Sequence, residues 1–533
     1  MARIPIVKTD ILGLIKDQSP NELDLRAFSE ILNARVQDGS IQRFTGHQPA
    51  LAPPTQDPFW LLPAPLQQAY YWIWASSDKV FAFTGGAHED ISRTVGGAYS
   101  GAPGVWTGGI FNGIPILNNG ADVPQYWANP GPGNNLADLP NWQAGVRVKA
   151  LRPYKNYLVG IDVTKGATRY PQMVKWSHIA DPGSVPSSWD ETDPTVDAGE
   201  FPLSETPGTL IDMLTLRDTN IVYKDDSVYS MVPTSSGNIF KFQRILQEAA
   251  LLTRNAVKKF NFRGEKHIVF SPDDIFVHDG VTATPILESR LRKWLFSNLD
   301  VTNYVNSFIV MDFAYSEAWI CFPMQGTEFP NMAIVYNFRT GTLATRELPE
   351  ITHAESGIVI DISGSGDTAT WDGDAASWDS DLSSWGERIY NPGSSRVILA
   401  KGGTGRDFFA ADATDSFDGA AFTTTIERAG LTVVGQDRQG NPIQDTTTNK
   451  LVTAVYPRIE SDSSVIINIY VGSQENRQSP IVWEGPFPFD PQVDRFVNPL
   501  VQGKILSFRF EATTQGYFRF YGYDIEVVPV GSF

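Results

Sequence analysis

The chain has 533 residues, of which 42% are hydrophobic and 19% charged, and its formal net charge is −18. This length exceeds one ordinary core and predicts two or three domains, or one large closed β architecture with additions. The acidic balance argues against generic nucleic-acid binding, because such binding needs Lys and Arg to neutralise phosphates. The one cysteine, Cys321, excludes an intramolecular disulfide and a cysteine-based metal site, and its apolar surroundings predict a buried side chain.

The N-terminal segment lacks the apolar core and cleavage pattern of a signal peptide. No apolar run approaches the length that a membrane-spanning helix needs. We therefore expect a soluble protein that folds in a reducing cytoplasm, with no membrane-spanning segment.

Residues 1–45 predict an N-terminal arm and a first strand. The spacing of residues 25–33 predicts a helical turn or two. The pair Asp38-Gly39 then indicates a β-hairpin, because both residues tolerate the positive φ angles of a tight hairpin turn.

Residues 46–360 contain short alternating or apolar runs, each closed by Gly, Asn or Asp, which predict many strands and few helices. Helical periodicity appears mainly in residues 246–258 and 288–298. The strands recur as close-set meanders of about four, which favours β-propeller blades over an array of sandwiches. The repeat has no fixed period, so it does not give the number of blades.

Residues 361–411 predict an acidic, tryptophan-containing excursion followed by closing strands. Strands alternate well again in residues 412–533, which we interpret as a C-terminal antiparallel, sandwich-like β domain. The expected fold class is all-β, a β-propeller with an additional antiparallel β-sandwich-like domain.

Signals for catalysis, cofactors and metals are poor, and we predict none of these sites. The six histidines are scattered; His267 and His278 lie on or beside neighbouring strands, and we interpret them as unrelated strand positions rather than a ligand pair. Residues 402–406 are Gly-rich but lack the Lys and the strand–loop–helix setting of a phosphate loop.

The excursion carries the two most unusual patterns of the chain. Its carboxylates favour a solvated acidic loop over a calcium site; they are Asp372, Asp374, Asp379 and Asp381. Its tryptophans, spaced seven residues apart, favour a protein interface over a sugar-stacking surface; they are Trp371, Trp378 and Trp385.

Five phrases, in their order along the chain, resemble the tail nozzle (tail hub, or packaged-DNA stabilisation) family of short-tailed bacteriophages, and the Asn33-Ala34-Arg35…Asp38-Gly39 phrase fits as well. They occupy residues 116–127, 170–190, 216–229, 271–280 and 334–349. The second phrase departs from the family, because His178 follows Trp-Ser where an acidic residue is usual. The resemblance covers roughly residues 33–350 and is weaker in the C-terminal third.

The resemblance implies a structural virion protein and not an enzyme. Members form β-propellers and assemble as hexamers below the portal and adaptor, where they extend the tail channel, retain packaged DNA and conduct it at ejection. It therefore implies a homohexameric ring, adaptor (head–tail connector) and tail fibre or needle partners, passing double-stranded DNA, and a place in the virion tail after synthesis in the host cytoplasm. The alternative is a glycan-binding or glycan-cleaving propeller that acts on the host surface.

Overall fold

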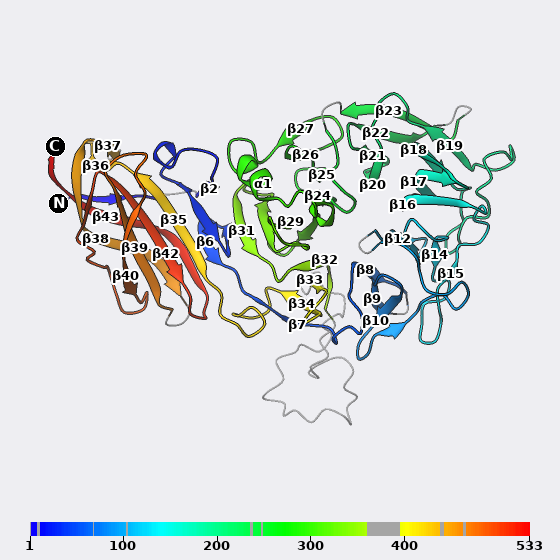
Figure 1. Cartoon of the computed structure of the whole chain (residues 1–533), viewed down its shortest axis with the longest axis horizontal. Coiled ribbons are helices and arrows are strands. Elements are labelled where there is room, and N and C mark those ends of the chain that lie inside the picture. Colours follow the sequence, from blue (N-terminus) through cyan, green and yellow to red (C-terminus); the bar gives the residue numbers. More distant parts are fainter. Residues whose placement is uncertain are drawn as a thin grey trace, which may run out of the picture.

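A computed structural model describes residues 2–7, 11–67, 69–102, 105–234, 238–246, 249–359, 395–437, 442–461 and 465–532. The fold is all-β, a β-propeller joined to an antiparallel β-sandwich, as predicted. Figure 1 shows the two parts side by side, with both termini at the sandwich end. The propeller is therefore inserted between the N-terminal and C-terminal strands of the sandwich.

Within the described residues, six four-stranded sheets and one end of a nine-stranded sheet form seven blades. The first three blades follow one another along the chain. Their strands are β8 (Trp60–Pro65), β9 (Tyr70–Ala75), β10 (Val80–Phe83) and β11 (Glu89–Asp90); β12 (Thr107–Phe111), β13 (Ile114–Asn118), β14 (Gln125–Tyr126) and β15 (Ala137–Asp138); and β16 (Val146–Tyr154), β17 (Tyr157–Lys165), β18 (Thr168–Trp176) and β19 (Gly199–Pro202).

The next three blades repeat this antiparallel meander. Their strands are β20 (Leu210–Leu216), β21 (Thr219–Lys224), β22 (Val228–Pro233) and β23 (Phe240–Leu246); β24 (Val257–Asn261), β25 (Glu265–Phe270), β26 (Ile275–His278) and β27 (Ala283–Pro285); and β28 (Phe308–Asp312), β29 (Glu317–Phe322), β30 (Met332–Asn337) and β31 (Leu343–Glu347). The first strand of each blade lies innermost, around the propeller axis (Figure 1).

The seventh blade closes the ring with a strand from the other end of the propeller sequence. It contains β32 (Ile351–Ile358), β33 (Ser395–Lys401), β34 (Asp407–Ala411) and, outermost, β7 (His47–Pro49). Strand β7 pairs antiparallel with β34, as Phe409 opposite Pro49 and Ala411 opposite His47. Because this closure leaves the ring of blades without a free end, we expect the propeller to be rigid.

The sandwich has two layers that combine the ends of the chain. One layer is β4 (Glu30–Leu32), β35 (Thr424–Leu431), β42 (Ile505–Ala512), β39 (Ile467–Gln474) and β40 (Val482–Phe489). The other is β41 (Val501–Gly503), β38 (Thr448–Ser461), β43 (Phe518–Ser532), β6 (Ser40–Arg43) and β5 (Ala34–Gln37), with β1 (Ala2–Pro5) also on β43.

Aromatic side chains fill the space between these layers. Phe510 lies 5.0 Å from both Phe520 and Tyr523, and Phe508 lies 5.2 Å from Tyr523, measured between ring centroids. All four are buried. Smaller pieces flank the sandwich: β2 (Gly13–Leu14) beside β3 (Ala27–Phe28), β36 (Val433–Gln436) beside β37 (Pro442–Gln444), and the 3₁₀ turn η1 (Pro20–Glu22).

The Asp38-Gly39 hairpin is confirmed. Asp38 and Gly39 have φ angles of 50° and 73° between β5 and β6, as a two-residue hairpin turn requires. The helical expectation for residues 25–33 is wrong, because β3 and β4 occupy that range. Pairing of β4 with β31 and β35 outweighs its local helical spacing.

The two longer helical expectations have different outcomes. Within residues 288–298 the helix α1 (Arg292–Asn298) forms, and a short 3₁₀ turn, η2 (Tyr304–Asn306), follows. In residues 246–258 the described part is an irregular connection with a turn at residues 253–255 that leads into β24, so a helix there is wrong. The spaced apolar residues, such as Ala249, Leu251 and Ala256, pack separately into the core.

Candidate functional site: the junction of sandwich and propeller

Asn33, between β4 and β5, ties the first strands of the sandwich to blade six. Its backbone has a φ of 55°, a left-handed conformation that Asn tolerates better than most residues. Its Nδ2 donates to the Glu347 carboxylate (2.7 Å) and to the Thr423 carbonyl (2.8 Å), and its Oδ1 accepts the Glu347 N–H (2.9 Å). One buried side chain thus bridges the propeller and both ends of the sandwich sequence.

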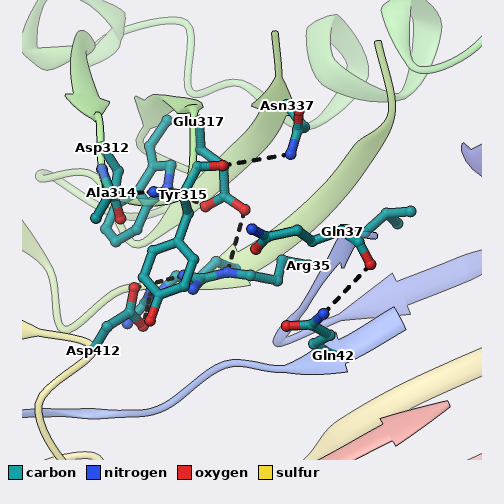
Figure 2. Close-up of polar contacts among 12 residues, drawn as sticks. Arg35, Gln37, Gln42, Asp312, Ala314, Tyr315, Glu317, Asn337 and Asp412 are labelled. Carbon is teal, nitrogen blue, oxygen red and sulfur yellow. Dashed lines mark hydrogen bonds and ion pairs between the residues drawn. The ribbon is translucent and has the colours of Figure 1, made fainter. Parts of the chain in front are cut away.

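Arg35, two residues later on β5, is the centre of a buried ionic cluster (Figure 2). Its Nη2 lies 2.5 Å from Oδ2 of Asp412, and its Nε lies 3.2 Å from Oε1 of Glu317. Its guanidinium also stacks on the ring of Tyr315, 3.4 Å from the centroid. The partners come from the end of blade seven and from blade six, so Arg35 joins the sandwich to two blades.

Arg346 on β31 supplies the second cation. Its Nη1 lies 3.0 Å from Oδ1 of Asp412, and its guanidinium lies 4.4 Å from the ring centroids of both Phe44 and Trp319. Asp412 therefore receives one arginine on each carboxylate oxygen. The two guanidinium charges hold the pKa of Asp412 below its usual value in spite of its burial.

Two further carboxyls belong to the cluster. Oδ1 of Asp312, at the end of β28, accepts the backbone N–H groups of Ala314 (3.1 Å) and Tyr315 (3.4 Å). Glu317 accepts the indole N–H of Trp319 (3.1 Å). Burial, together with the nearby charge of Asp412, raises the pKa of Asp312 to about 6; burial also raises the pKa of Glu317 to about 7, although Arg35 opposes that change.

This arrangement is suited to holding domains together. The side chains of Arg35, Arg346, Glu317 and Asp412 are at most 5% exposed, so the cluster offers little surface to a ligand. A buried ion pair adds little or no stability relative to a well-packed apolar contact, but loss of one partner leaves an uncompensated buried charge and is strongly destabilising. The cluster therefore fixes which surfaces of the sandwich and the propeller meet.

A second polar cluster lies inside the propeller, between blades four and five. The Tyr223 hydroxyl lies 2.7 Å from Nδ1 of His267 and 2.6 Å from Nε2 of His278. The Gly280 N–H donates to Nδ1 of His278, so the proton of this neutral ring is on Nε2. Nε2 of His278 then donates to the Tyr223 hydroxyl, and that hydroxyl donates to Nδ1 of His267. Nε2 of His267 donates to the Thr215 carbonyl.

The interpretation of the two histidines as unrelated strand positions is therefore wrong. They face each other in the β25–β26 register, and burial lowers the pKa of His267 to about 3 and that of His278 to about 4. Both rings are neutral, and each nitrogen is already in a hydrogen bond. They hold blades four and five together and have no lone pair left for a metal.

Charged side chains also occupy the axis of the propeller. Arg152 on β16 pairs with Asp212 on β20 (2.7 Å) and donates to the Gly108 carbonyl on β12 (3.0 Å). Lys258 on β24 pairs with Glu355 on β32. Blades five and seven flank blade six, so this last ion pair lies over the inner strand β28 of blade six.

The predicted interface residues Trp371, Trp378 and Trp385 lie outside the described residues, as do the acidic residues Asp372, Asp374, Asp379 and Asp381. Their segment connects β32 to β33 in blade seven. Residues 402–406 form the turn between β33 and β34, and Cys321 is buried as predicted. In the part of the chain that is described, no group of three or more His, Cys, Asp or Glu is placed to hold a metal ion, and no helix could span a membrane.

The sequence reasoning missed the ionic cluster. Arg35 and Arg346 lie within the family-like phrases, but the alternation of their strands gives no sign of which charges meet. The one available signal is that each arginine occurs in a strand beside apolar residues, in Asn33-Ala34-Arg35-Val36 and Ala344-Thr345-Arg346. An arginine at a core-facing strand position requires a buried partner.

Comparisons with known proteins add little to this picture. No family model matches the chain, and no curated protein matches it. Among solved structures, the WD40 domain of Toxoplasma gondii coronin aligns with a TM-score of 0.37 and 8% identity, over 75% of this chain and 88% of that chain. The AfRom2 CNH domain gives 0.36 and 8%, over 69% and 98%. PorZ, a surface component of the type-IX secretion system of Porphyromonas gingivalis, gives 0.34 and 9%, over 84% and 46%.

Proposed function

We propose that the chain is a structural subunit of a short-tailed bacteriophage tail, similar to the tail nozzle. Copies assemble as a ring below the portal and adaptor, extend the tail channel, retain packaged DNA and conduct it at ejection. The chain acts as a structural component and not as an enzyme.

The order of the five family-like phrases carries the proposal. Residues 116–127 lie in blade two, 170–190 in and after β18 of blade three, 216–229 in blade four, 271–280 in blade five and 334–349 in blade six. Each of five successive blades therefore contains one phrase, located at strands and the turns beside them. Chance resemblance to isolated turns gives no reason for this regular placement.

The architecture supports a role as a rigid structural subunit. The propeller is closed by β7, and the sandwich that holds it uses strands from both ends of the chain. A ring of identical copies needs head-to-tail contacts between two different surfaces, and it needs subunits that keep one shape. The buried junction fixes the relative position of the two parts.

The proposed conduit for DNA is the centre of the ring of copies and not the axis of one propeller. The inner strands of the propeller carry the Lys258–Glu355 and Arg152–Asp212 ion pairs. A net charge of −18 on each chain would repel a DNA backbone that passes through the centre of a ring. DNA would then slide and not bind.

Light scattering and negative-stain imaging of the purified chain test the proposal. We expect six-fold rings, with a mass about six times that of one chain. These rings should show no retention of duplex DNA at physiological salt, because the net charge of −18 on each chain repels the phosphate backbone. Trimers would contradict the proposal and favour a fibre-type enzyme or receptor binder; a chain that stays monomeric at high concentration would contradict its ring-forming part.

A further inference from the structure

The connection that leads into β24 of blade five contains an arginine that reaches two other blades. Nη1 of Arg254 donates to the carbonyl of Val105, just before β12 (3.2 Å), and to the carbonyl of Lys149 on β16 (3.1 Å). Among the described residues no carboxylate forms an ion pair with this guanidinium, and neither its Nε nor its Nη2 has a hydrogen-bond acceptor. An arginine stays charged in a protein, so Arg254 is a cation without a direct counter-ion.

Lys149 is a second cation in contact with the first. Its Nζ lies 3.6 Å from Oδ2 of Asp162, which is longer than a hydrogen bond, and its side chain is 37% exposed. Asp162, in a bulge of β17, is already held by Arg169 on β18, whose Nε and Nη2 donate to the two carboxylate oxygens (2.7 and 2.6 Å). Burial lowers the pKa of Lys149, and the charges of Arg254 and Arg169 lower it further, although Asp162 opposes them.

The acids around these two cations are already neutralised. Arg152 on β16 donates to both carboxylate oxygens of Asp212 on β20, from Nε (3.0 Å) and from Nη2 (2.7 Å). The other charged groups that shift the pKa of either cation are Asp162, Asp212, Arg152 and Arg169. Glu355, whose charge acts on Arg152, has its own partner in Lys258. Four cations therefore meet two anions here, and two positive charges are in surplus in a chain whose net charge is −18.

We propose that Lys149 and Arg254 bind a phosphate dianion, at a site between the inner strands of the propeller. Two neighbouring positive charges that are partly buried repel each other, and a dianion balances both. Nε and Nη2 of an arginine form a fork that fits two phosphate oxygens, and a lysine adds a point charge. The exposed part of Lys149 gives the ligand access from water. The inference does not depend on the proposed function.

Isothermal titration calorimetry of the full chain with inorganic phosphate tests the site. The titration is run at about pH 8, where phosphate carries two negative charges, and at constant ionic strength set with sodium chloride. We expect one phosphate per chain, with half-saturation at about 1 mM or below. Acetate, which carries a single charge, should show no saturable binding in the same range.

Each of the two cations is removed in turn. Lys149→Gln and Arg254→Gln should each weaken phosphate binding about tenfold or more, because each removes a charged donor from the ligand. Arg244→Gln is the matched control. It makes the same change in net charge at β23 of blade four, where Arg244 pairs with Glu205 (3.1 Å) and is 31% exposed. This control should bind phosphate as the wild type does.

The outcomes are distinct. No saturable binding, acetate binding as tight as phosphate binding, or wild-type affinity in Lys149→Gln would overturn the proposal. Equal weakening in Arg244→Gln would also overturn it, because that result means a general effect of net charge. Lys149→Gln decides the question if Arg254→Gln does not fold, since Nζ of Lys149 donates no hydrogen bond within the described residues.

Thermal unfolding in phosphate gives a second readout. Phosphate stabilises folded proteins in general because it is excluded from their surface, so a rise in melting temperature shared equally by all variants would count against the site. A bound ligand stabilises only the chains that bind it. We therefore expect a larger rise in the wild type and in Arg244→Gln than in Lys149→Gln.

Discussion

The propeller and the junction each bury a polar cluster, but they do so in opposite ways. The Tyr223–His267–His278 relay contains only neutral groups, and each has a hydrogen-bond partner. The junction contains ionisable groups of both signs in direct contact. Neutral relays cost little to bury and suit an interface between blades that never separates. A charged cluster is sensitive to the loss of any member, which suits a contact between domains.

Removing Arg35 should produce the largest effect. Arg35→Ala leaves Glu317 and one oxygen of Asp412 buried without their cation, and we expect a loss of about 3–5 kcal/mol in the free energy of unfolding. Urea denaturation measures it. Arg3→Ala removes a surface pair with Asp524, in which Arg3 is 51% exposed, and should cost under about 1 kcal/mol. Similar losses in the two variants would remove the contrast between buried and surface charge.

Acid should weaken the relay, and base should weaken the junction. His267 and His278 have lowered pKa values in the folded chain. Below about pH 6.5 the unfolded chain therefore binds protons at these histidines that the folded chain does not bind. Their contribution is complete above that pH and falls as the pH drops, by up to about 1.4 kcal/mol per pH unit for each histidine. Asp312 and Glu317 have raised pKa values, so their contribution is complete at low pH and is lost as the pH rises through about 6 to 7.

His278→Gln tests the predicted loss of stability at acid pH. The amide can still donate to Tyr223 but cannot titrate, so the free energy of unfolding should fall less steeply between about pH 6 and pH 4.5, by up to about 1.4 kcal/mol per pH unit. Chemical denaturation at several pH values gives the slopes. Val277→Ala, at the neighbouring position of β26, controls for lost packing and should keep the wild-type slope. Parallel curves for His278→Gln and the wild type would rule out the relay as the source.

Breaking the relay at its centre should have a smaller effect at neutral pH. Tyr223→Phe keeps the ring but leaves Nδ1 of His267 and the N–H of His278 without a partner, at a cost of about 1–3 kcal/mol. Tyr456→Phe removes a hydroxyl that contacts Glu526 near the surface and should change stability by less than about 0.5 kcal/mol. Thermal unfolding of both variants gives the comparison, and equal shifts would count against a buried relay.

The two regions also differ in how far their sequence predicts them. Blades form from consecutive strands, so their turns and alternation were visible, as in the turns of residues 217–218 and 225–227. The number of blades is not visible in the sequence, because the inner strands are separated by unequal numbers of residues. They start at Trp60, Thr107, Val146, Leu210, Val257, Phe308 and Ile351. Insertions between strands hide the period.

Long-range pairing in the sandwich and the junction could not be predicted in the same way. Strand β6 pairs with β43 through Ile41 opposite Phe520, and Arg35 meets Asp412, at sequence separations that local patterns do not encode. Each strand looks ordinary alone. The family resemblance predicted a propeller, but its phrases mark turns and strand edges and carry no information on which charges are buried together.

The smallest expected effect comes from substitutions in two hairpin turns, one in the sandwich and one in the propeller. Gly39, between β5 and β6 of the sandwich, and Gly113, between β12 and β13 of blade two, have φ angles of 73° and 83° with open space around them. Alanine at either position forces a side chain into a left-handed backbone, at a cost of about 1–2 kcal/mol. If the domains melt separately, Gly39→Ala should lower the transition of the sandwich and Gly113→Ala that of the propeller. Calorimetry separates the transitions, and a single transition lowered equally by both would show that the junction makes the two domains one cooperative unit.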